Sequence, residues 1–345
     1  MNTDTSVDAS VVIVSFNTRE VLHACLTQLY ASLGTRRVEV IVVDNASRDD
    51  SAGMVAEDFP DVRLVRSAVN LGFAAANNVG FRLAQGRFVV LLNPDALIAD
   101  GALGLAIDRM DVDPEIGMAG ARLINRDGHD EPSARLFPSL LNEVLVLSGL
   151  AWKYPKSRIF GRFDRTWADP AEPAQVDWVP GAFAIMRHEA LKQVGEFDER
   201  FFLYYEEVDL CRRFKQQGWQ IWYWPDIVVR HWGGESSKTV ENVEFTSKGS
   251  QLTLWRMRSG LLYYRKHHGR LVTGLVAGLE SGWHGLRAFK ARLSPKASPA
   301  KAEESRRIAS LMQGPLPEAP AAAVSPDQIV PKLPALPPSA VSKPF

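Results

Sequence analysis

Residues 10–47 read SVVIVSFNTREVLHACLTQLYASLGTRRVEVIVVDNAS and decide the fold class. Residues 11–14 and 38–43 are short apolar runs rich in β-branched side chains, which is typical of strands buried on both faces of a sheet. Residues 18–33, between these runs, carry their apolar side chains on one helical stripe. Strand, helix and strand in this order form the repeating unit of a parallel sheet.

The same alternation continues along the chain. We expect a strand at 62–65, a helix at 73–84, a strand at 87–92 and a helix at 100–112. Residues 120–175 are rich in Arg, Pro and aromatic side chains, and we expect them to be irregular. Further elements are predicted as a strand at 182–187, a short helix from 188, a helix ending near 218, and strands at 220–223 and 227–230. The sequence therefore predicts an α/β fold with a mostly parallel, Rossmann-like central sheet flanked by helices.

Polar side chains follow three of the predicted strands. They are Ser15-Phe16-Asn17, Asp44-Asn45 and Asn93-Pro94-Asp95. Ligands of parallel α/β sheets bind at the carboxyl ends of the strands, where these clusters are expected to meet. Three such clusters together favour a nucleotide-type site.

The C-terminal third differs from the rest of the chain. Residues 249–290 are basic and predicted to be helical, whereas 11 of the 21 prolines follow residue 290. A Pro- and Ala-rich segment buries too little apolar surface to form a core. We therefore expect a catalytic domain at 1–240, a basic amphipathic helical extension at 241–290 and a disordered tail at 291–345.

Composition excludes several classes of protein. The 345 residues are 46% hydrophobic and 23% charged, as in globular proteins, and two cysteines cannot build a disulfide framework. No apolar stretch reaches 18 residues, and the polar first ten residues do not resemble a secretory signal. These features predict a cytoplasmic location.

The net charge of zero conceals two opposite charges. Residues 1–254 hold 26 Lys and Arg against 35 Asp and Glu, whereas residues 255–307 hold 12 against 3. The basic segment is either a solvated helical face or a surface for an anionic partner. The charge pattern alone leaves the identity of that partner open.

Ordered motifs over residues 9–270 resemble the inverting family 2 glycosyltransferases, which have the GT-A fold. The matching pieces are VVIVSFN (11–17), VVDNAS (42–47), NLGFAAANNVG (70–80), LLNPDA (91–96), WVPGAFAIMR (178–187), FDERFFLYYEEVDLCRR (197–213), VRHWGGESS (229–237) and RSGLLYYRKHHG (258–269). The segment PSARLFPS (132–139) adds a likeness to bacterial rhamnosyltransferases.

The resemblance implies a nucleotide-sugar site. Its residues would be Ser15, Phe16, Asn17, Asp44, Asn45, Asn78, Asn93 and Asp95. Asp44 can accept a hydrogen bond from a pyrimidine N3–H, and Phe16 can cover the ring of the base. Alternatively, Asp44 caps a helix and Phe16 belongs to the core.

The resemblance also implies a divalent metal ion, Mg²⁺ or Mn²⁺. Family members hold the metal with an Asp-x-Asp motif or a variant, which is Asn-Pro-Asp here, so Asp95 supplies the charge. His231 would be the second protein ligand, and an imidazole tilts the preference toward Mn²⁺.

The general base implied by the family is Glu207, the second residue of an acidic pair that begins a helix. Burial would raise the pKa of a carboxyl group toward the range that proton transfer needs. Alternatively, these carboxylates are solvated at a helix N-terminus. The sugar and acceptor pocket would contain Trp178, Gly181, Ala182, Glu206, Asp209 and Arg135.

The resulting prediction is a metal-dependent inverting glycosyltransferase. Its donor would be a nucleotide-diphosphate sugar, with dTDP-rhamnose as first choice, and its acceptor a polysaccharide or polyprenyl-diphosphate-linked glycan. Such an enzyme would be peripheral at the inner face of the cytoplasmic membrane, where residues 250–307 would contact the anionic surface. We expect no nucleic-acid partner. Alternatives are a UDP-hexose or UDP-galactofuranose donor, a nucleotidyltransferase, and an inactive nucleotide-sugar or glycan-binding module. A nucleotidyltransferase usually carries a Gly-rich basic phosphate loop, which SFNTRE (15–20) is not.

Overall fold

The computed structural model describes residues 7–233, 250–293 and 299–313. Within these residues, ten strands form one sheet. The strands are β1 (Ala9–Ser15), β2 (Val38–Asp44), β3 (Arg63–Arg66), β4 (Phe88–Leu92), β5 (Ala96–Ile98), β6 (Ile116–Ile124), β7 (Asp130–Glu131), β8 (Ala174–Gln175), β9 (Phe183–Arg187) and β10 (Gln220–His231). The helices are α1 (Arg19–Ser32), α2 (Ser51–Asp58), α3 (Phe73–Leu83), α4 (Ala102–Val112), α5 (Leu140–Leu147), α6 (Leu150–Lys153), α7 (His188–Val194), α8 (Glu206–Gln216), α10 (Ser250–His267), α11 (Gly269–Leu293) and α12 (Pro299–Gln313).

The sheet has the strand order β3-β2-β1-β4-β9-β6-β10-β5, with β7 beside β6 and β8 beside β10. β3, β2, β1 and β4 run parallel, as do β6 and β10. β9 is antiparallel to both β4 and β6, and β5 is antiparallel to β10. The mostly parallel α/β sheet predicted from the sequence is therefore confirmed.

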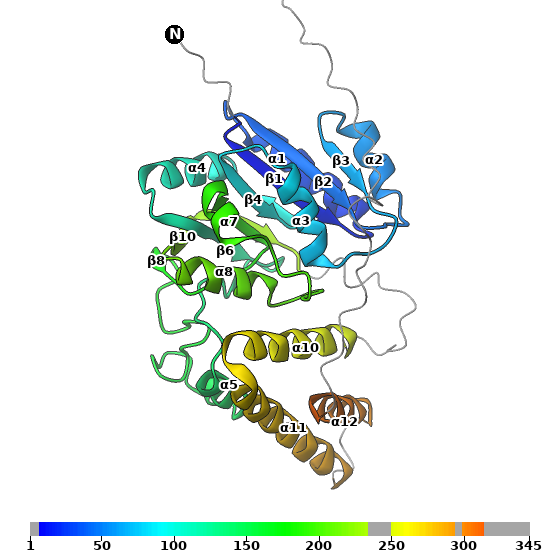
Figure 1. Cartoon of the computed structure of the whole chain (residues 1–345), viewed down its shortest axis with the longest axis vertical. Helices are drawn as coiled ribbons and strands as arrows, with labels where there is room; N and C mark the ends of the chain where they lie inside the picture. Colours follow the sequence, from blue (N-terminus) through cyan, green and yellow to red (C-terminus); the bar gives the residue numbers. More distant parts are fainter. Residues whose placement is uncertain (1–6, 234–249, 294–298, 314–345) are drawn as a thin grey trace, which may run out of the picture.

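Two apolar layers enclose the sheet, whose strands and flanking helices are drawn in Figure 1. On β1, Val11 and Ile13 belong to the layer that packs against α1, α2 and α4. Val12 and Val14 point to the opposite layer, which contains residues of α3, α7 and α8. Side chains alternate between the two faces of a strand, so a continuous apolar run is buried on both.

The prediction that residues 120–175 are irregular is wrong in part. They contain most of β6 and the whole of α5 and α6. Gly117 and Gly120 weaken the strand pattern of β6, but packing requires Gly120, because a Cβ there would lie 2.5 Å from the Val179 side chain. Similarly, the two strands predicted at 220–230 form the single strand β10, with a register shift between Trp224 and Val228.

The C-terminal helices lie below the sheet in Figure 1. α10 and α11 confirm the predicted helical segment, which breaks at Gly269, where φ is +79°. The predicted disordered tail is wrong for residues 299–313, which form α12 and bury Ile308 and Met312. Tyr263 and Tyr264 of α10 belong to the same apolar core as α8. The predicted domain boundary at 240 and the tail beyond 313 lie outside the described residues.

Candidate active site

A histidine and a carboxylate meet where β4 and β10 end and β5 begins. β5 pairs antiparallel with β10 so that His231 lies opposite Ala96, next to Asp95 in the chain. The Nε2 atom of His231 lies 3.5 Å from Oδ1 of Asp95 and 3.3 Å from Nδ2 of Asn93. The backbone N–H of Trp232 donates to the Asp95 carbonyl at 3.0 Å and closes this turn. The structure thus brings together the three residues that the sequence predicted for the metal side of the site.

Glu131 is a functional candidate that the sequence analysis missed. Its Oε2 atom lies 2.9 Å from Nδ1 of His231 and holds the imidazole with Nε2 toward Asp95. Burial lowers the pKa of His231, but Asp95 and Glu131 outweigh burial and raise it to about 9. Glu131 lies 100 residues before His231, and the β6–β7 hairpin brings it there. No local motif signals such a contact.

The donor set fits a divalent cation with two protein ligands. A buried carboxylate beside an imidazole suits Mn²⁺ or Mg²⁺, and a carboxylate on the other ring nitrogen is the usual support of a metal-binding histidine. The described part of the chain contains no cluster of three or more His, Cys, Asp or Glu side chains able to hold a metal ion.

Asp44, at the end of β2, has an unsatisfied acceptor. The side chain is buried, and one oxygen accepts a hydrogen bond from the Ser47 backbone at 3.3 Å. The other oxygen, Oδ1, has no hydrogen-bond partner among the described residues. Burial raises the pKa of this carboxyl group, against the hydrogen bonds of Ser47. An unpaired buried acceptor is costly unless a ligand satisfies it.

Three asparagines predicted for the nucleotide site bind other parts of the protein. Asn17, with φ at +52°, donates its N–H to Ser47 and accepts from the Arg48 N–H. Asn45 contacts the loop before α3, at Asn70, Leu71 and Gly72. Asn78 holds Phe197 and Glu199 against α3. These side chains shape the loops of the site.

The two remaining residues of the first polar cluster differ in burial. Ser15 is fully buried, and its hydroxyl lies 2.9 Å from that of Thr18. Phe16 is half-buried, so part of its side chain remains available to a ligand.

Two carboxylates begin α8. Tyr204 and Tyr205, directly before them, both have left-handed backbone conformations, at φ +68° and +69°. Such strain in consecutive non-glycine residues is typical of functional sites. Glu206 is buried and Glu207 half-buried, and the Oε2 atom of each lacks a hydrogen-bond partner in the part of the chain that the structure describes.

The two glutamates differ in their electrostatic surroundings. Burial raises the pKa of both carboxyl groups. The charge of Glu207 raises the pKa of Glu206 further, whereas the Arg135 guanidinium opposes the rise at Glu207. Both carboxyl groups therefore have a raised pKa, and only that of Glu207 is opposed by a nearby arginine.

Arg135 and Trp178 form one wall beside Glu207. The Arg135 guanidinium lies 4.5 Å from the centre of a Trp178 ring, and its Nε donates to Asp164 at 2.6 Å. The indole N–H of Trp178 donates to the Leu136 carbonyl at 3.0 Å. Four residues after Trp178, the backbone carbonyl of Ala182 accepts a hydrogen bond from the Asn93 N–H at 3.0 Å. The loop from Trp178 to Ala182 thus connects the wall beside Glu207 with the Asn-Pro-Asp turn.

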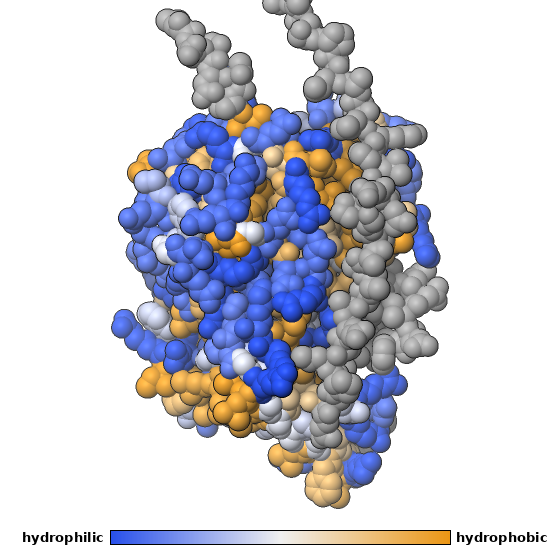
Figure 2. All heavy atoms as spheres, in the orientation of Figure 1, coloured by the Kyte–Doolittle hydropathy of each residue, from blue (hydrophilic) through white to orange (hydrophobic). Residues whose placement is uncertain are grey.

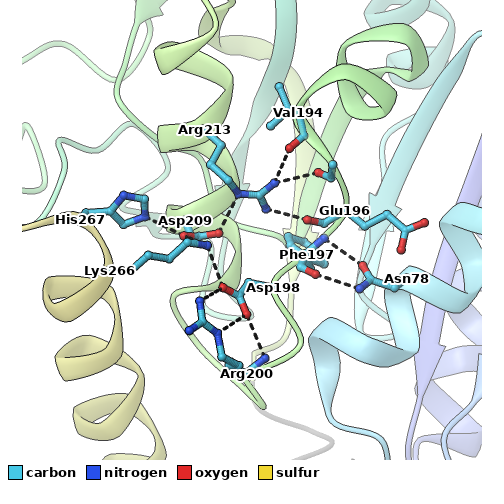
Figure 3. A network of polar contacts seen from close by, with 11 residues as sticks. Asn78, Val194, Glu196, Phe197, Asp198, Arg200, Asp209, Arg213, Lys266 and His267 are labelled. Atoms are coloured by element: carbon cyan, nitrogen blue, oxygen red, sulfur yellow. Dashed lines mark hydrogen bonds and ion pairs between the residues drawn. The ribbon is translucent and has the colours of Figure 1, made fainter. Parts of the chain in front are cut away.

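Asp209, which the sequence predicted for the sugar and acceptor pocket, lies in a buried charged network (Figure 3). It is fully buried, and its oxygens contact Arg213 at 2.9 Å and both Lys266 and His267 at 2.7 Å. Lys266 also contacts Asp198 at 2.8 Å. The network attaches α10 to the helix that begins with Glu206 and Glu207. The sequence hinted at these partners only through the basic run RKHH at 265–268.

An Asn-Pro-Asp turn beside a histidine and a glutamate pair at the start of a helix are thus set on a mixed α/β sheet, as the resemblance to GT-A glycosyltransferases implied. The family model for glycosyl transferase family 2 matches residues 10–195, and the chain belongs to this family. The predictions of the family and of a transferase enzyme are confirmed.

Two curated relatives are rhamnosyltransferases. The chain is 32% identical over 234 residues to the N-acetylglucosaminyl-diphospho-decaprenol L-rhamnosyltransferase of Mycobacterium tuberculosis, covering 64% of this chain and 75% of that protein. It is 25% identical over 268 residues to rhamnosyltransferase WbbL of Escherichia coli, covering 73% and 91%. The likeness to rhamnosyltransferases predicted from the sequence is thereby confirmed.

A solved structure supports the fold. GalNAc-T7, in complex with UDP, GalNAc and Mn²⁺, aligns with a TM-score of 0.52 and 14% identity, over 90% of this chain and 56% of that one. At this identity the likeness shows a shared fold.

Proposed function

We propose that the protein transfers a sugar, with inversion, from a nucleotide-diphosphate donor to a lipid-linked or polysaccharide glycan. The Glu206–Glu207 pair carries this proposal, because it presents unsatisfied carboxylate oxygens at a strained helix start. The rhamnosyltransferase relatives favour dTDP-rhamnose as the donor and a polyprenyl-diphosphate-linked glycan as the acceptor.

Glu207 acts as the general base. Its raised pKa keeps the carboxylate basic enough to take a proton from an acceptor hydroxyl, while the Arg135 guanidinium opposes the rise. The hydroxyl oxygen then attacks the anomeric carbon as the bond to the diphosphate breaks. Activity should therefore rise as the pH increases through the pKa of Glu207, because only the deprotonated form accepts the proton.

Asp95 and His231 would hold a divalent metal ion, Mg²⁺ or Mn²⁺. When bound, this metal offsets the negative charge that develops on the departing diphosphate. Glu131 fixes the orientation of the imidazole through Nδ1. The amide of Asn93, beside His231, completes the polar edge of this side of the site.

The nucleotide lies against the ends of β1 and β2. The free Oδ1 of Asp44 accepts from the N3–H of a pyrimidine base, and the half-buried Phe16 covers the ring. Ser15, Asn17, Asn45 and Asn78 hold the surrounding loops. Trp178, Gly181, Ala182 and Arg135 border the sugar and acceptor.

The enzyme works at the inner face of the cytoplasmic membrane and binds no nucleic acid. A lipid-linked acceptor places its reactive sugar near the headgroups, so contact with an anionic membrane surface through residues 250–307 would bring the enzyme to its substrate. The structure describes no helix that is both long and apolar enough to span a bilayer. Membrane contact would thus be peripheral.

A panel of nucleotide sugars with Mg²⁺ or Mn²⁺, scored by nucleotide diphosphate release, tests the proposal. Glu207→Gln should lower kcat by about 10² to 10⁴ and leave nucleotide binding unchanged. Glu20→Gln is the matched control, because Glu20 is an exposed carboxylate on α1. If nucleotide diphosphate is released only from a UDP-hexose or UDP-galactofuranose, that sugar nucleotide is the donor and dTDP-rhamnose is not. Nucleotide binding without release from any donor would favour an inactive binding module.

A further inference from the structure

α11 presents an exposed apolar stripe along its length. The stripe consists of Leu271, Leu275, Leu286, Phe289 and Leu293, with Leu271 79% and Leu293 70% exposed. At about 100° per residue, these five side chains fall within an arc of about 60°. The buried residues of α11 include Val276, Glu280 and His284, on the opposite side of the helix. Within the described residues the stripe therefore faces away from the protein.

Apolar side chains of the neighbouring helices extend this surface. α5 packs against α11 and α6, and it exposes Leu141 and Val144. Trp152 of α6 is 77% exposed, and Tyr154 and Ile159 follow it on the surface. Figure 2 shows hydrophobic residues gathered along the lower edge of the molecule, where Figure 1 places α5 and α11. Large contiguous apolar surfaces on soluble proteins mark interaction sites.

Basic and aromatic side chains border the apolar surface. Residues 150–167 contain five cations, Lys153, Lys156, Arg158, Arg162 and Arg165. The single carboxylate of this segment, Asp164, is paired with Arg135.

A hollow of about 370 Å³ lies in the same region. Lys156, Arg158, Arg165 and Trp167 line it, together with Asp169 and Glu172. Arg158 lies 4.7 Å from the centre of the Trp167 ring. At the end of α11, Lys290 and Arg292 flank the apolar stripe.

We propose that the α11 stripe and the surface of residues 141–167, together called the docking face, rest on a bilayer with anionic headgroups. Apolar and aromatic side chains enter the headgroup region while flanking cations contact lipid phosphates, as in interfacial helices. A second copy of the chain is a poorer occupant. A symmetric dimer would place the cations of this face against those of its copy.

The docking face differs from the membrane surface expected from the sequence. Lys266 of α10 is committed to Asp198 and Asp209, and Arg258 is buried. Part of the positive charge of α10 is therefore paired with carboxylates of the catalytic body. The bilayer instead meets α11 and the segment from α5 to Trp167.

The docking face is connected to the candidate active site. Glu143 of α5 accepts a hydrogen bond from the Tyr264 hydroxyl at 2.8 Å. Tyr264 contacts Tyr263, whose ring packs against Tyr205. Tyr205 directly precedes the glutamates of α8. A lipid-linked acceptor held at this face would have its sugar on the same side as the proposed base. This statement rests on the function proposed above.

Vesicle sedimentation tests the docking face. The full chain should bind phosphatidylcholine vesicles containing phosphatidylglycerol and lose binding as salt rises or as the anionic lipid is omitted. Leu275→Gln combined with Phe289→Gln, and separately Lys290→Glu combined with Arg292→Glu, should each weaken binding about tenfold. Val112→Gln is the matched control, because Val112 is 84% exposed on α4.

Two further measurements separate the possible outcomes. Nucleotide diphosphate release with a soluble acceptor should be unchanged in these variants. Loss of vesicle binding with normal release therefore supports the docking face as a membrane contact. Equal vesicle binding by all variants would overturn it, as would the absence of binding by the natural sequence. A concentration-dependent dimer that Leu275→Gln with Phe289→Gln dissociates would assign the face to a second copy instead. If no nucleotide sugar yields nucleotide diphosphate, the proposed glycosyltransferase function is contradicted, whereas the docking face is not.

Discussion

Gly181 has no structural reason to be glycine. A Cβ there would lie 3.5 Å from the Phe73 ring, which is an ordinary contact. Gly120 contrasts with it, because its Cβ would collide with Val179. We propose that a ligand approaches the backbone closely here and requires the glycine in the loop before β9.

We therefore expect Gly181→Ala to fold normally and to lower kcat/KM at least tenfold. Its free energy of unfolding should stay within about 0.5 kcal/mol of the natural sequence, whereas Gly120→Ala should lose about 1–3 kcal/mol through overpacking. Urea unfolding gives the free energy of unfolding, and initial rates give kcat/KM. Full turnover by Gly181→Ala would show that no ligand contacts this backbone.

We propose that Glu131 acts through His231, whose Nδ1 atom its carboxylate contacts. Replacing it with Gln keeps the size of the side chain and removes the charge that holds Nδ1. Glu131→Gln should weaken metal affinity about 10- to 100-fold in the presence of nucleotide, measured by calorimetric titration. Asp130→Asn is the control, because Asp130 pairs with Arg122 at the surface. If both variants bind metal as the natural sequence does, Glu131 has no role in the metal site.

At the scale of elements, the charged network determines how α8 is held. Lys266→Met removes one cation from two carboxylates, of which Asp209 is fully buried. Because Arg213 and His267 remain, we expect a loss of about 1–3 kcal/mol in the free energy of unfolding. Arg265→Met, its neighbour on α10, should change stability far less.

The stability lost in Lys266→Met should depend on pH. Burial raises the pKa of Asp209, but His267, Arg213 and Lys266 outweigh it and hold the pKa below its ordinary value. A lowered pKa contributes stability above the ordinary value, about 3.9, and loses it as the pH falls through the folded-state value. The difference between the natural sequence and Lys266→Met should therefore be largest near neutral pH and shrink below about pH 4. A pH-independent difference would point to lost packing.

On the scale of the whole molecule, the C-terminal helices and the sheet share a core. Tyr263 and Tyr264 are buried among residues of α8 and α3, and Ile308 of α12 belongs to the same apolar cluster. We expect α10 and β1 to unfold in one cooperative transition, so their amides should exchange with solvent at the same free energy. Tyr263→Ala should lower both values by about 3–5 kcal/mol. Exchange of α10 at a much lower free energy than β1 would define a separate domain.

The buried strands β1 to β4 and the helices α1 and α3 follow from the sequence alone, because their patterns repeat within single elements. The Asn-Pro-Asp turn and the glutamate pair are visible for the same reason, as short motifs at element ends. Local patterns mislead at β6, whose glycines serve packing against Val179, and at α12, which a proline-rich composition conceals.

Contacts between distant segments were decided by the tertiary structure. Glu131 reaches His231 only because the β6–β7 hairpin lies beside β10. Lys266 and His267 meet Asp209 only because α10 packs on the catalytic body. The opposite charges of the two chain segments partly neutralise each other inside the molecule. The sequence reveals those charges, but their pairing depends on which buried surfaces meet, and that is a property of the folded chain.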